Sequence, residues 1–278
     1  VLKLYMELEK PTLANVTSDL QLVCDKVREV LKIPSMQTGL KIIKNISKIL
    51  RKYDYKVTVT LGLRRQIAEI MNLEGGDTVD KNYMIIVDMG TSTVVAHLVN
   101  ANNTETMDGK ACFNSQGVYG REVTGRIIRA EKVGADELQR LLVEDINKLI
   151  EGLCSNNNIN LQDITAVVCA GNTVMTHFLL GLSAEHIRRT PYTPVSLIHP
   201  PLRAVEVGIG INPRGLLYAL PCISGWVGSD LTAGILATEM HKHDKLCLLV
   251  DIGTNGEIIL GNKDWLIASS ASAGPALE

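Results

Sequence analysis

The chain has 278 residues, 46% of them hydrophobic, which is enough for two domains with buried cores and excludes a disordered or fibrous chain. Its 28 basic and 30 acidic residues give a net charge of −2 without a long Lys and Arg block, so we expect no nucleic-acid partner. No apolar run approaches the roughly 20 residues of a membrane span, so we expect no membrane partner either.

The ends of the chain and its cysteines bear on where it works. The chain begins at Val1 and ends at Glu278 within a run of small residues, which predicts a piece of a longer protein. No basic and apolar leader opens it. Its six cysteines are scattered without a C-x-x-C spacing, which indicates reduced and mostly buried thiols. We therefore expect a reducing, cytoplasmic location.

The first 80 residues predict a small α+β domain. Hydrophobic periodicity predicts a strand at 2–8, a helix at 20–31, a helix from about residue 37 to 50 and a strand at 55–61. Thr17 or Ser18 can cap the first helix. The expected buried stripe of the second helix is Leu40, Ile43, Ile46, Ile49 and Leu50. Gly75-Gly76-Asp77 places a boundary near residue 80, which leaves 81–278 as a second domain.

The second domain predicts alternating strands and helices. In chain order we expect a meander of strands at 84–87, 94–100 and 105–113, helices at 121–132 and 136–153, and a strand at 164–170 followed by a helix. A loop-rich stretch with four prolines follows at 191–201, then a helix at 231–240 and strands at 246–250 and 258–260. This pattern is typical of a mixed α/β domain.

One unit, a strand followed by D-x-G-T and a second strand, occurs twice. Asp88-Met89-Gly90-Thr91 follows the apolar run 84–87, and Asp251-Ile252-Gly253-Thr254 follows the run 246–250. The two aspartates are 163 positions apart (251 minus 88), which is too far for a short solenoid repeat. The repeat therefore predicts two similar lobes.

These paired turns suggest a phosphate site. Glycine lets backbone N–H groups converge on an anion, and hydroxyl side chains add further donors. The donors expected from the two turns are Gly90, Thr91, Ser92 and Thr93, and Gly253, Thr254, Asn255 and Gly256. Asp88 and Asp251 can hold Mg²⁺ through its waters. One such match alone could be a simple turn, but two facing turns predict a nucleotide cleft.

Three further places allow a binding or a structural interpretation. Gly171-Asn172-Thr173 begins a helix, where it can attract an anion, or Asn172 can simply cap the helix. Asp230 can cap its helix or present a carboxylate to the cleft. Asn114 and Gln116 can bind a loop backbone or a ligand. These alternatives stay open at this point.

The order of these elements resembles the ribonuclease-H-like fold of actin, sugar kinases and heat-shock ATPases, in which the two turns are called phosphate 1 and phosphate 2. The resemblance covers residues 83–278. It implies an α/β actin-like ATPase domain that binds ATP and Mg²⁺, preceded here by the small α+β domain. The family's Gly-rich adenosine motif is expected beyond Glu278.

A closer resemblance is to the reductive activators of corrinoid proteins. It is carried by Asn114-Ser-Gln116, Gly120-Arg-Glu122, Ala170-Gly-Asn-Thr173, His177, Leu180-Gly181, Val227-Gly-Ser-Asp230, Ala268-Ser-Ser270 and Ala273-Gly-Pro275. Residues 1–80 look like that family's middle domain. Glu122 stands where the family has an Asp, which leaves the role of that position open.

The resemblance implies a function. ATP hydrolysis would drive reduction of Co(II) to Co(I) in the corrinoid protein of a methyltransferase system, with Asp88, Asp230 and Asp251 as catalytic residues. The implied partners are a corrinoid protein and an electron donor, and the family's iron–sulfur cluster would belong to a domain outside this chain. The alternatives are a small-molecule kinase of the same fold or a nucleotide-switched interaction module. A homodimer is left open.

Overall fold

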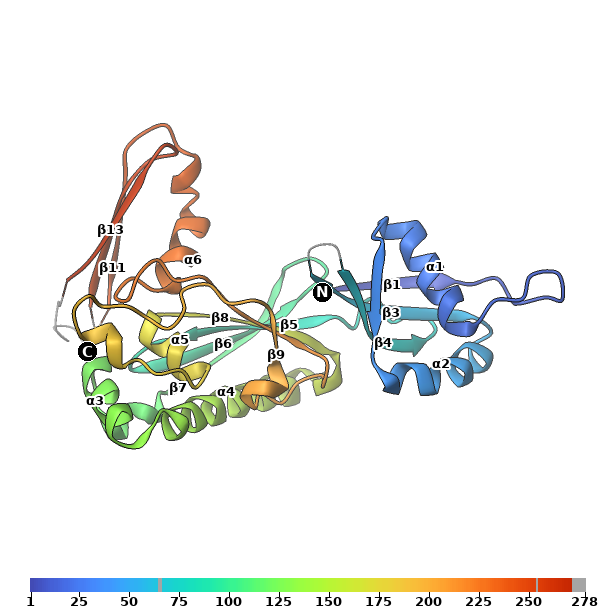
Figure 1. Cartoon of the computed structure of the whole chain (residues 1–278), viewed down its shortest axis with the longest axis horizontal. Helices are drawn as coiled ribbons and strands as arrows, with labels where there is room; N and C mark the ends of the chain where they lie inside the picture. Colours follow the sequence, from blue (N-terminus) through green and yellow to red (C-terminus); the bar gives the residue numbers. More distant parts are fainter. Residues whose placement is uncertain (65–66, 254, 272–278) are drawn as a thin grey trace.

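The computed structural model describes residues 1–64, 67–253 and 255–271. Within this part the strands form a four-stranded sheet, a six-stranded sheet and a three-stranded sheet, one after another along the chain. Figure 1 shows the four-stranded sheet at one end of the molecule, the six-stranded sheet in the middle and the three-stranded sheet rising from the other end. The fold is mixed α/β, as predicted.

The first sheet has the order β1-β3-β4-β2 and carries two helices. Its elements are β1 (Leu2–Glu7), α1 (Asp19–Leu31), β2 (Ser35–Thr38), α2 (Leu40–Lys52), β3 (Lys56–Arg64) and β4 (Ile67–Gly75). The Ser18 hydroxyl accepts a hydrogen bond from the Gln21 N–H, which confirms Ser18 as the N-cap of α1. Both helices bury apolar residues against the sheet and give this unit a core of its own.

The prediction for the second helix is wrong in two respects. Residues 35–38 form β2 parallel to β4, so α2 begins at Leu40 and not near residue 37. The buried face of α2 consists of Ile42, Ile46 and Leu50, whereas Leu40 and Ile43 are exposed. The buried residues are spaced four apart, so they share one face of the helix.

The second sheet has the order β7-β6-β5-β8-β10-β9. Its strands are β5 (Tyr83–Met89), β6 (Thr93–Asn100), β7 (Thr106–Phe113), β8 (Ile164–Gly171), β9 (Leu202–Arg203) and β10 (Leu216–Ala219), and its helices are η1 (Ser115–Tyr119), α3 (Val123–Val133), α4 (Asp136–Asn157), η2 (Leu161–Asp163), α5 (Thr173–Leu179), η3 (Glu185–Arg188) and η4 (Ala204–Val207). The expected meander of β5, β6 and β7 is confirmed. β10 in this sheet, like β4 in the first, was not predicted.

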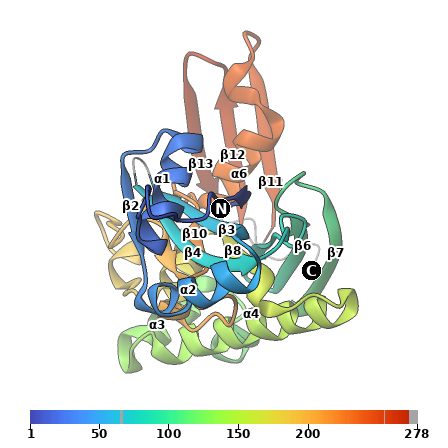
Figure 2. The ribbon, with the colours of Figure 1, turned by 90° about the vertical axis from the view of Figure 1, so that its right-hand side faces the viewer.

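The large core of the molecule lies around this second sheet. β5 pairs with β6 on one side and runs parallel to β8 on the other, so its end is fixed from both directions. The long helix α4 packs along β6 and β7 and extends beneath the sheet in Figure 2. The side chains of Ile85 and Val87 on β5 are fully buried. The first D-x-G turn therefore leaves a rigid strand.

The third sheet is small and has the order β11-β12-β13. Its elements are α6 (Ser229–Thr238), η5 (Met240–Lys242), β11 (Cys247–Ile252), β12 (Gly256–Gly261) and β13 (Leu266–Ala271). Helix α6 covers one face of the sheet through a core of four buried residues, Val227, Leu231, Met240 and Ile259. On the opposite face Leu248, Val250 and Ile258 are exposed. β13 was not predicted, because its second half consists of small residues.

Two expectations about the whole chain can be compared with the structure. All six cysteines, each of which lies in a described segment, are free, and four of them are buried. No helix in the described ranges is long and apolar enough to cross a membrane.

Candidate phosphate-binding site

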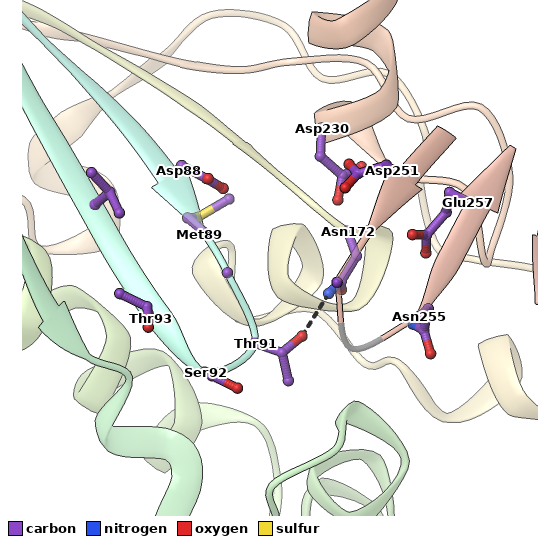
Figure 3. A pocket seen from close by; sticks show the side chains of 13 residues that line it. Asp88, Met89, Thr91, Ser92, Thr93, Asn172, Asp230, Asp251, Asn255 and Glu257 are labelled. Atoms are coloured by element: carbon purple, nitrogen blue, oxygen red, sulfur yellow. Dashed lines mark hydrogen bonds between the residues drawn. The ribbon is translucent and has the colours of Figure 1, made fainter. Parts of the chain in front are cut away.

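The two D-x-G turns line one cavity of about 280 Å³ between the six-stranded and the three-stranded sheet (Figure 3). Its described lining residues are Asp88, Met89, Gly90, Thr91, Ser92, Thr93, Val95, Asn172, Asp230, Asp251, Gly253, Asn255 and Glu257. The sequence repeat thus places two hairpins, far apart in the chain, on opposite walls of one cavity.

The two hairpins have matching registers. In the first, Asp88 pairs with Val95 and the last pair before the turn is Met89 with Val94. In the second, Asp251 pairs with Glu257 and the last pair is Ile252 with Gly256. Each aspartate therefore lies one pair before the end of its hairpin. Because alternate residues of a strand share a face, this register aims both carboxylates at the cavity.

Gly90 is required by the tight geometry of the first turn. A Cβ atom at this position would lie 2.4 Å from the Thr93 carbonyl oxygen, far inside van der Waals contact. Thr91 follows with a nearly buried side chain, and its hydroxyl accepts a hydrogen bond from the Asn172 amide at 3.2 Å. The first turn is thereby tied to the start of α5.

The structure confirms Asn172 as a helix cap, and it also places this residue in the wall of the cavity. Its carboxamide oxygen accepts a hydrogen bond from the Met175 N–H at 2.9 Å, so it caps α5. Its amide nitrogen binds Thr91, and the residue lines the cavity. The helix cap and the cavity wall are therefore the same side chain.

Asn114 and Gln116, for which the sequence left two roles, bind backbone. The Asn114 amide donates to the Gly90 carbonyl oxygen at 3.0 Å, and the Gln116 amide donates to the Leu138 carbonyl oxygen at 2.7 Å. Neither residue is among those that line the cavity. They form the support behind the first turn.

The second turn is held differently. The Gly253 N–H donates to the Asn255 carbonyl oxygen at 3.0 Å and closes the loop between β11 and β12. Among the described residues, a Cβ atom on Gly253 would approach the Asn255 carbonyl oxygen alone, at an ordinary distance of 3.9 Å. Thr254, a predicted phosphate ligand, lies outside the described residues.

Asp230 reaches the cavity from the first turn of α6. Its carboxylate accepts a hydrogen bond from the Leu231 N–H at 2.8 Å. Gly228, just before the helix, lets the start of α6 lie close to the backbone of Asn172, since a Cβ atom on Gly228 would lie 2.3 Å from the Asn172 Cα atom. Asp230 therefore contacts its own helix and also lines the cavity, as Figure 3 shows.

Four carboxylates share the cavity, and their electrostatics are unfavourable in the absence of a cation. Burial raises the pKa of Asp88, and the negative charge of Asp251 raises it further. Burial raises the pKa of Asp230 to about 6, with a smaller contribution from Asp251 and Asp88. Burial, Asp230 and Asp251 raise the pKa of Glu257 to about 7. A bound cation would relieve this repulsion.

The donor set suits a hydrated Mg²⁺ ion. It consists of carboxylate oxygens, which are the ligands that Mg²⁺ prefers, and none of the described lining residues is basic. Among the residues that the structure describes, no group of three His, Cys, Asp or Glu side chains is close enough to enclose a metal. Coordination through waters, as the sequence predicts for Asp88 and Asp251, agrees with both observations.

Not every predicted ligand reaches the cavity. The predicted residues that line it are Asp88, Gly90, Thr91, Ser92, Thr93, Asn172, Asp230, Asp251, Gly253 and Asn255. Gly171, Thr173 and Gly256 are not among the lining residues. The Thr173 hydroxyl is fully buried and donates to the Ser224 carbonyl oxygen at 2.6 Å, so it supports a loop.

Sequence reasoning missed Glu257 and Arg126. Glu257 occupies the hairpin position that corresponds to Val95, opposite the aspartate, so the repeat itself could have indicated it. Arg126 carried no signal, because it lies within an ordinary helical pattern. Its guanidinium is fully buried behind the first turn and donates to the Thr91 carbonyl oxygen at 2.6 Å.

Comparison with protein families agrees with this architecture, since three family models match successive parts of the chain. Residues 1–80 match the RACo linker region, residues 83–243 the RACo middle region, and residues 245–278 the C-terminal domain of RACo, the ASKHA domain. The cavity thus lies between an actin-like ASKHA lobe and the region before it. The chain belongs to the RACo family.

Individual relatives support the same assignment. The chain is 32% identical over 199 residues to the corrinoid activation enzyme RamQ of Eubacterium limosum, covering 70% of this chain and 33% of that protein. It is 22% identical over 207 residues to the [Co(II) methylated amine-specific corrinoid protein] reductase of Methanosarcina barkeri, covering 70% of this chain and 37% of the relative. The chain spans about a third of the length of these curated relatives.

A solved structure matches nearly the whole chain. It is the reductive activator for corrinoid, iron-sulfur protein, with 35% sequence identity and a TM-score of 0.93 over 99% of this chain and 44% of the other. The family models also correct one expectation. Residues 1–80, which we compared with the family's middle domain, match its linker region, and the middle region begins at residue 83.

Proposed function

We propose that this chain forms the nucleotide-responsive part of an ATP-dependent reductive activator of a corrinoid protein. Membership of the RACo family and the names of its relatives support the corrinoid protein as the partner. The observation that carries ATP binding is the single cavity with a D-x-G turn on each wall. We also propose a cytoplasmic location and separate folding of residues 1–80 and 81–278, which have separate cores.

In this proposal the two turns bind the phosphates of one ATP molecule. Backbone N–H groups and hydroxyls of Thr91, Ser92 and Thr93 serve one wall, and Gly253 and Asn255 serve the other. Asp88 and Asp251 hold Mg²⁺ through its waters. Bound Mg²⁺ would neutralise phosphate charge while the terminal phosphoryl group passes to water.

Asp230 is the candidate for orienting the attacking water. It enters the cavity from the side opposite the first turn, at the N-terminus of α6, and its partner Leu231 N–H fixes one carboxylate oxygen. In this role the carboxylate would accept a hydrogen bond from the attacking water molecule. Glu257 adds a further acceptor on the wall of the second hairpin.

ATP binding would close the two walls on the phosphates, and hydrolysis would release them. Such a change of shape can bias a partner complex between two states. The chemical balance is ATP and water giving ADP and phosphate, together with one electron that converts Co(II) to Co(I). A separate one-electron donor must supply that electron, because all six cysteines of this chain are free and scattered.

The test combines the chain with a Co(II) corrinoid protein, Mg·ATP and a one-electron chemical reductant. Formation of ADP and of Co(I), followed by its visible absorption, should both require ATP. Asp88→Ala and Asp251→Ala should each stop both processes and leave the fold intact, because each removes a carboxylate from the cavity. Asp264→Ala, at an exposed position between β12 and β13, is the matched control and should retain both.

The outcomes separate the alternatives. Undiminished hydrolysis in both Asp88→Ala and Asp251→Ala would contradict the site. ADP formation that depends on an added small-molecule acceptor would show a kinase. Hydrolysis without any ATP-dependent Co(I) formation would contradict the proposed coupling.

A further inference from the structure

The first turn rests on a buried cation. Arg126, in the first half of α3, is 1% exposed, and it is among the largest fully buried side chains of the described part. Its Nη2 donates to the Thr91 carbonyl oxygen at 2.6 Å, its Nε to the Gly120 carbonyl oxygen at 3.0 Å, and its Nη1 to the Gln116 side-chain oxygen at 3.1 Å. The guanidinium therefore lies one peptide group behind a wall of the phosphate cavity.

Hydrogen bonds to uncharged groups, and not a carboxylate, hold this cation in the described structure. Within the described ranges, no Asp or Glu forms an ion pair with Arg126. Its remaining neighbour is the Met175 sulfur, 3.5 Å from Nη1. Burial lowers the pKa of Arg126 to about 10, so the side chain stays charged at neutral pH. Buried charges in proteins are usually paired, and an uncompensated one is costly.

The contacts of Arg126 and Asn114 also orient the turn. Arg126 holds the Thr91 carbonyl and Asn114 holds the Gly90 carbonyl, both from the side of the protein interior. In a planar trans peptide the C=O and the following N–H point in opposite directions. The peptide N–H groups of Thr91 and Ser92 are thereby turned toward the cavity that these residues line.

We propose that Arg126 is a positioning residue for a polyphosphate anion. It fixes the first turn with its N–H groups toward the cavity, and the anion in the cavity supplies a counter-charge to a guanidinium that forms no ion pair within the described ranges. This inference rests on the proposed phosphate site, but it assigns a role to a residue that does not line the cavity. It also explains why a cation is buried here although no ion pair with it forms in the part of the chain that the structure describes.

The first experiment measures binding of inorganic tripolyphosphate with Mg²⁺ by isothermal titration calorimetry. Arg126→Met should weaken binding by about tenfold or more, because it removes the charge and the turn support together. Arg126→Lys, which keeps the charge, should recover part of that loss. Arg129→Met removes one positive charge from the exposed side of the same helix and should change affinity less than about twofold.

A second pair of variants separates charge from structural support. Met175→Glu places a carboxylate beside the guanidinium, and Met175→Gln has the same shape without the charge. If the anion supplies the missing counter-charge, the internal carboxylate competes with it. Met175→Glu should then bind tripolyphosphate about tenfold more weakly than Met175→Gln, while its unfolding temperature is equal or higher.

A purely structural role of Arg126 would not predict weaker tripolyphosphate binding together with equal or higher stability in Met175→Glu. Equal affinity of Met175→Glu and Met175→Gln would overturn the proposal, even if Arg126→Met failed to fold. Equal affinity of wild type and a folded Arg126→Met would also overturn it and leave the proposed function intact. No binding by the wild type would instead contradict the phosphate site and the proposal with it.

Discussion

The two hairpins that face each other across the cavity share a motif and a register, but they are built into very different surroundings. The first, β5 and β6, lies in a six-stranded sheet with a large core, and side chains of Asn114, Arg126 and Asn172 hold its turn. The second, β11 and β12, lies in a three-stranded sheet with one apolar face exposed. Its turn is closed by a backbone hydrogen bond of Gly253.

This difference shows that the direction of the aspartate and the contacts that hold the turn have separate structural origins. The D-x-G pattern and the strand register fix where the aspartate points, and these are local properties of either hairpin. The first turn is also held by hydrogen bonds from side chains of three other segments, Asn114, Arg126 and Asn172. Among the described residues the first turn is therefore the more constrained of the two, whereas the glycine of the second turn leaves room for a side chain.

The largest expected effect compares the residues that lie three positions before each aspartate. Ile85 is fully buried in the large core, whereas Leu248 is 63% exposed. Ile85→Ala should lower the free energy of unfolding by about 2–5 kcal/mol through the cavity it leaves. Leu248→Ala should change it by less than about 0.5 kcal/mol. Urea unfolding followed by circular dichroism measures both, and equal losses would contradict the contrast between the two sheets.

The next effect concerns the glycine of each turn. Gly90→Ala forces a methyl group to within 2.4 Å of the Thr93 carbonyl, so the turn must shift, at a cost of about 1–3 kcal/mol. Gly253→Ala places its methyl group at an ordinary distance of 3.9 Å and should leave stability nearly unchanged. Thermal unfolding of the two variants tests this. A larger loss in Gly253→Ala would reverse our assignment of the rigid and the permissive turn.

A third effect comes from the carboxylate between the hairpins. The folded protein raises the pKa of Asp230 to about 6 from 3.8, so the folded state binds this proton more tightly and ionisation of Asp230 costs stability above that pH. Asp230→Asn should therefore raise the free energy of unfolding at pH 8 by about 1–2 kcal/mol, and the gain should disappear near pH 4. Asp264→Asn, at an exposed position, should show no such gain.

The smallest expected effect is a change in the stabilisation that Asp230→Asn gives at pH 8. Asp251 contributes to the raised pKa of Asp230 across the gap between α6 and the second hairpin. In an Asp251→Asn background, the stabilisation by Asp230→Asn at pH 8 should shrink by a few tenths of a kcal/mol. Strict additivity of the two substitutions in chemical denaturation would indicate that the carboxylates do not share one cavity.

The sequence predicted those parts of the fold that depend on local periodicity. β5, β6, β7 and the long helix α4 were expected from their patterns, and Ser18 from helix-capping chemistry. The short strands β2 and β10 were missed, because their pairing partners are distant in sequence and their own residues carry little periodicity.

The same division holds for the site. Asp88, Asp251, Gly90 and Gly253 were predicted because a repeated motif is visible in one dimension. Arg126 was missed because its significance lies in three contacts with segments up to 35 residues away, and Thr173 was assigned to the ligand although tertiary packing turns its hydroxyl toward Ser224. Buried support for a turn becomes visible only in the folded arrangement.

The most direct test of the central claim is the Mg²⁺ dependence of ATP binding, measured by calorimetry on wild type, Asp88→Asn and Asp251→Asn. If both hairpins act on one Mg·ATP, the wild type should bind one ATP per chain far more tightly with Mg²⁺ than without. Each variant should lose this preference for two reasons. Loss of a carboxylate that holds Mg²⁺ weakens binding of Mg·ATP, and loss of its negative charge strengthens binding of metal-free ATP. An unchanged Mg²⁺ preference in either variant would contradict a site shared by both turns.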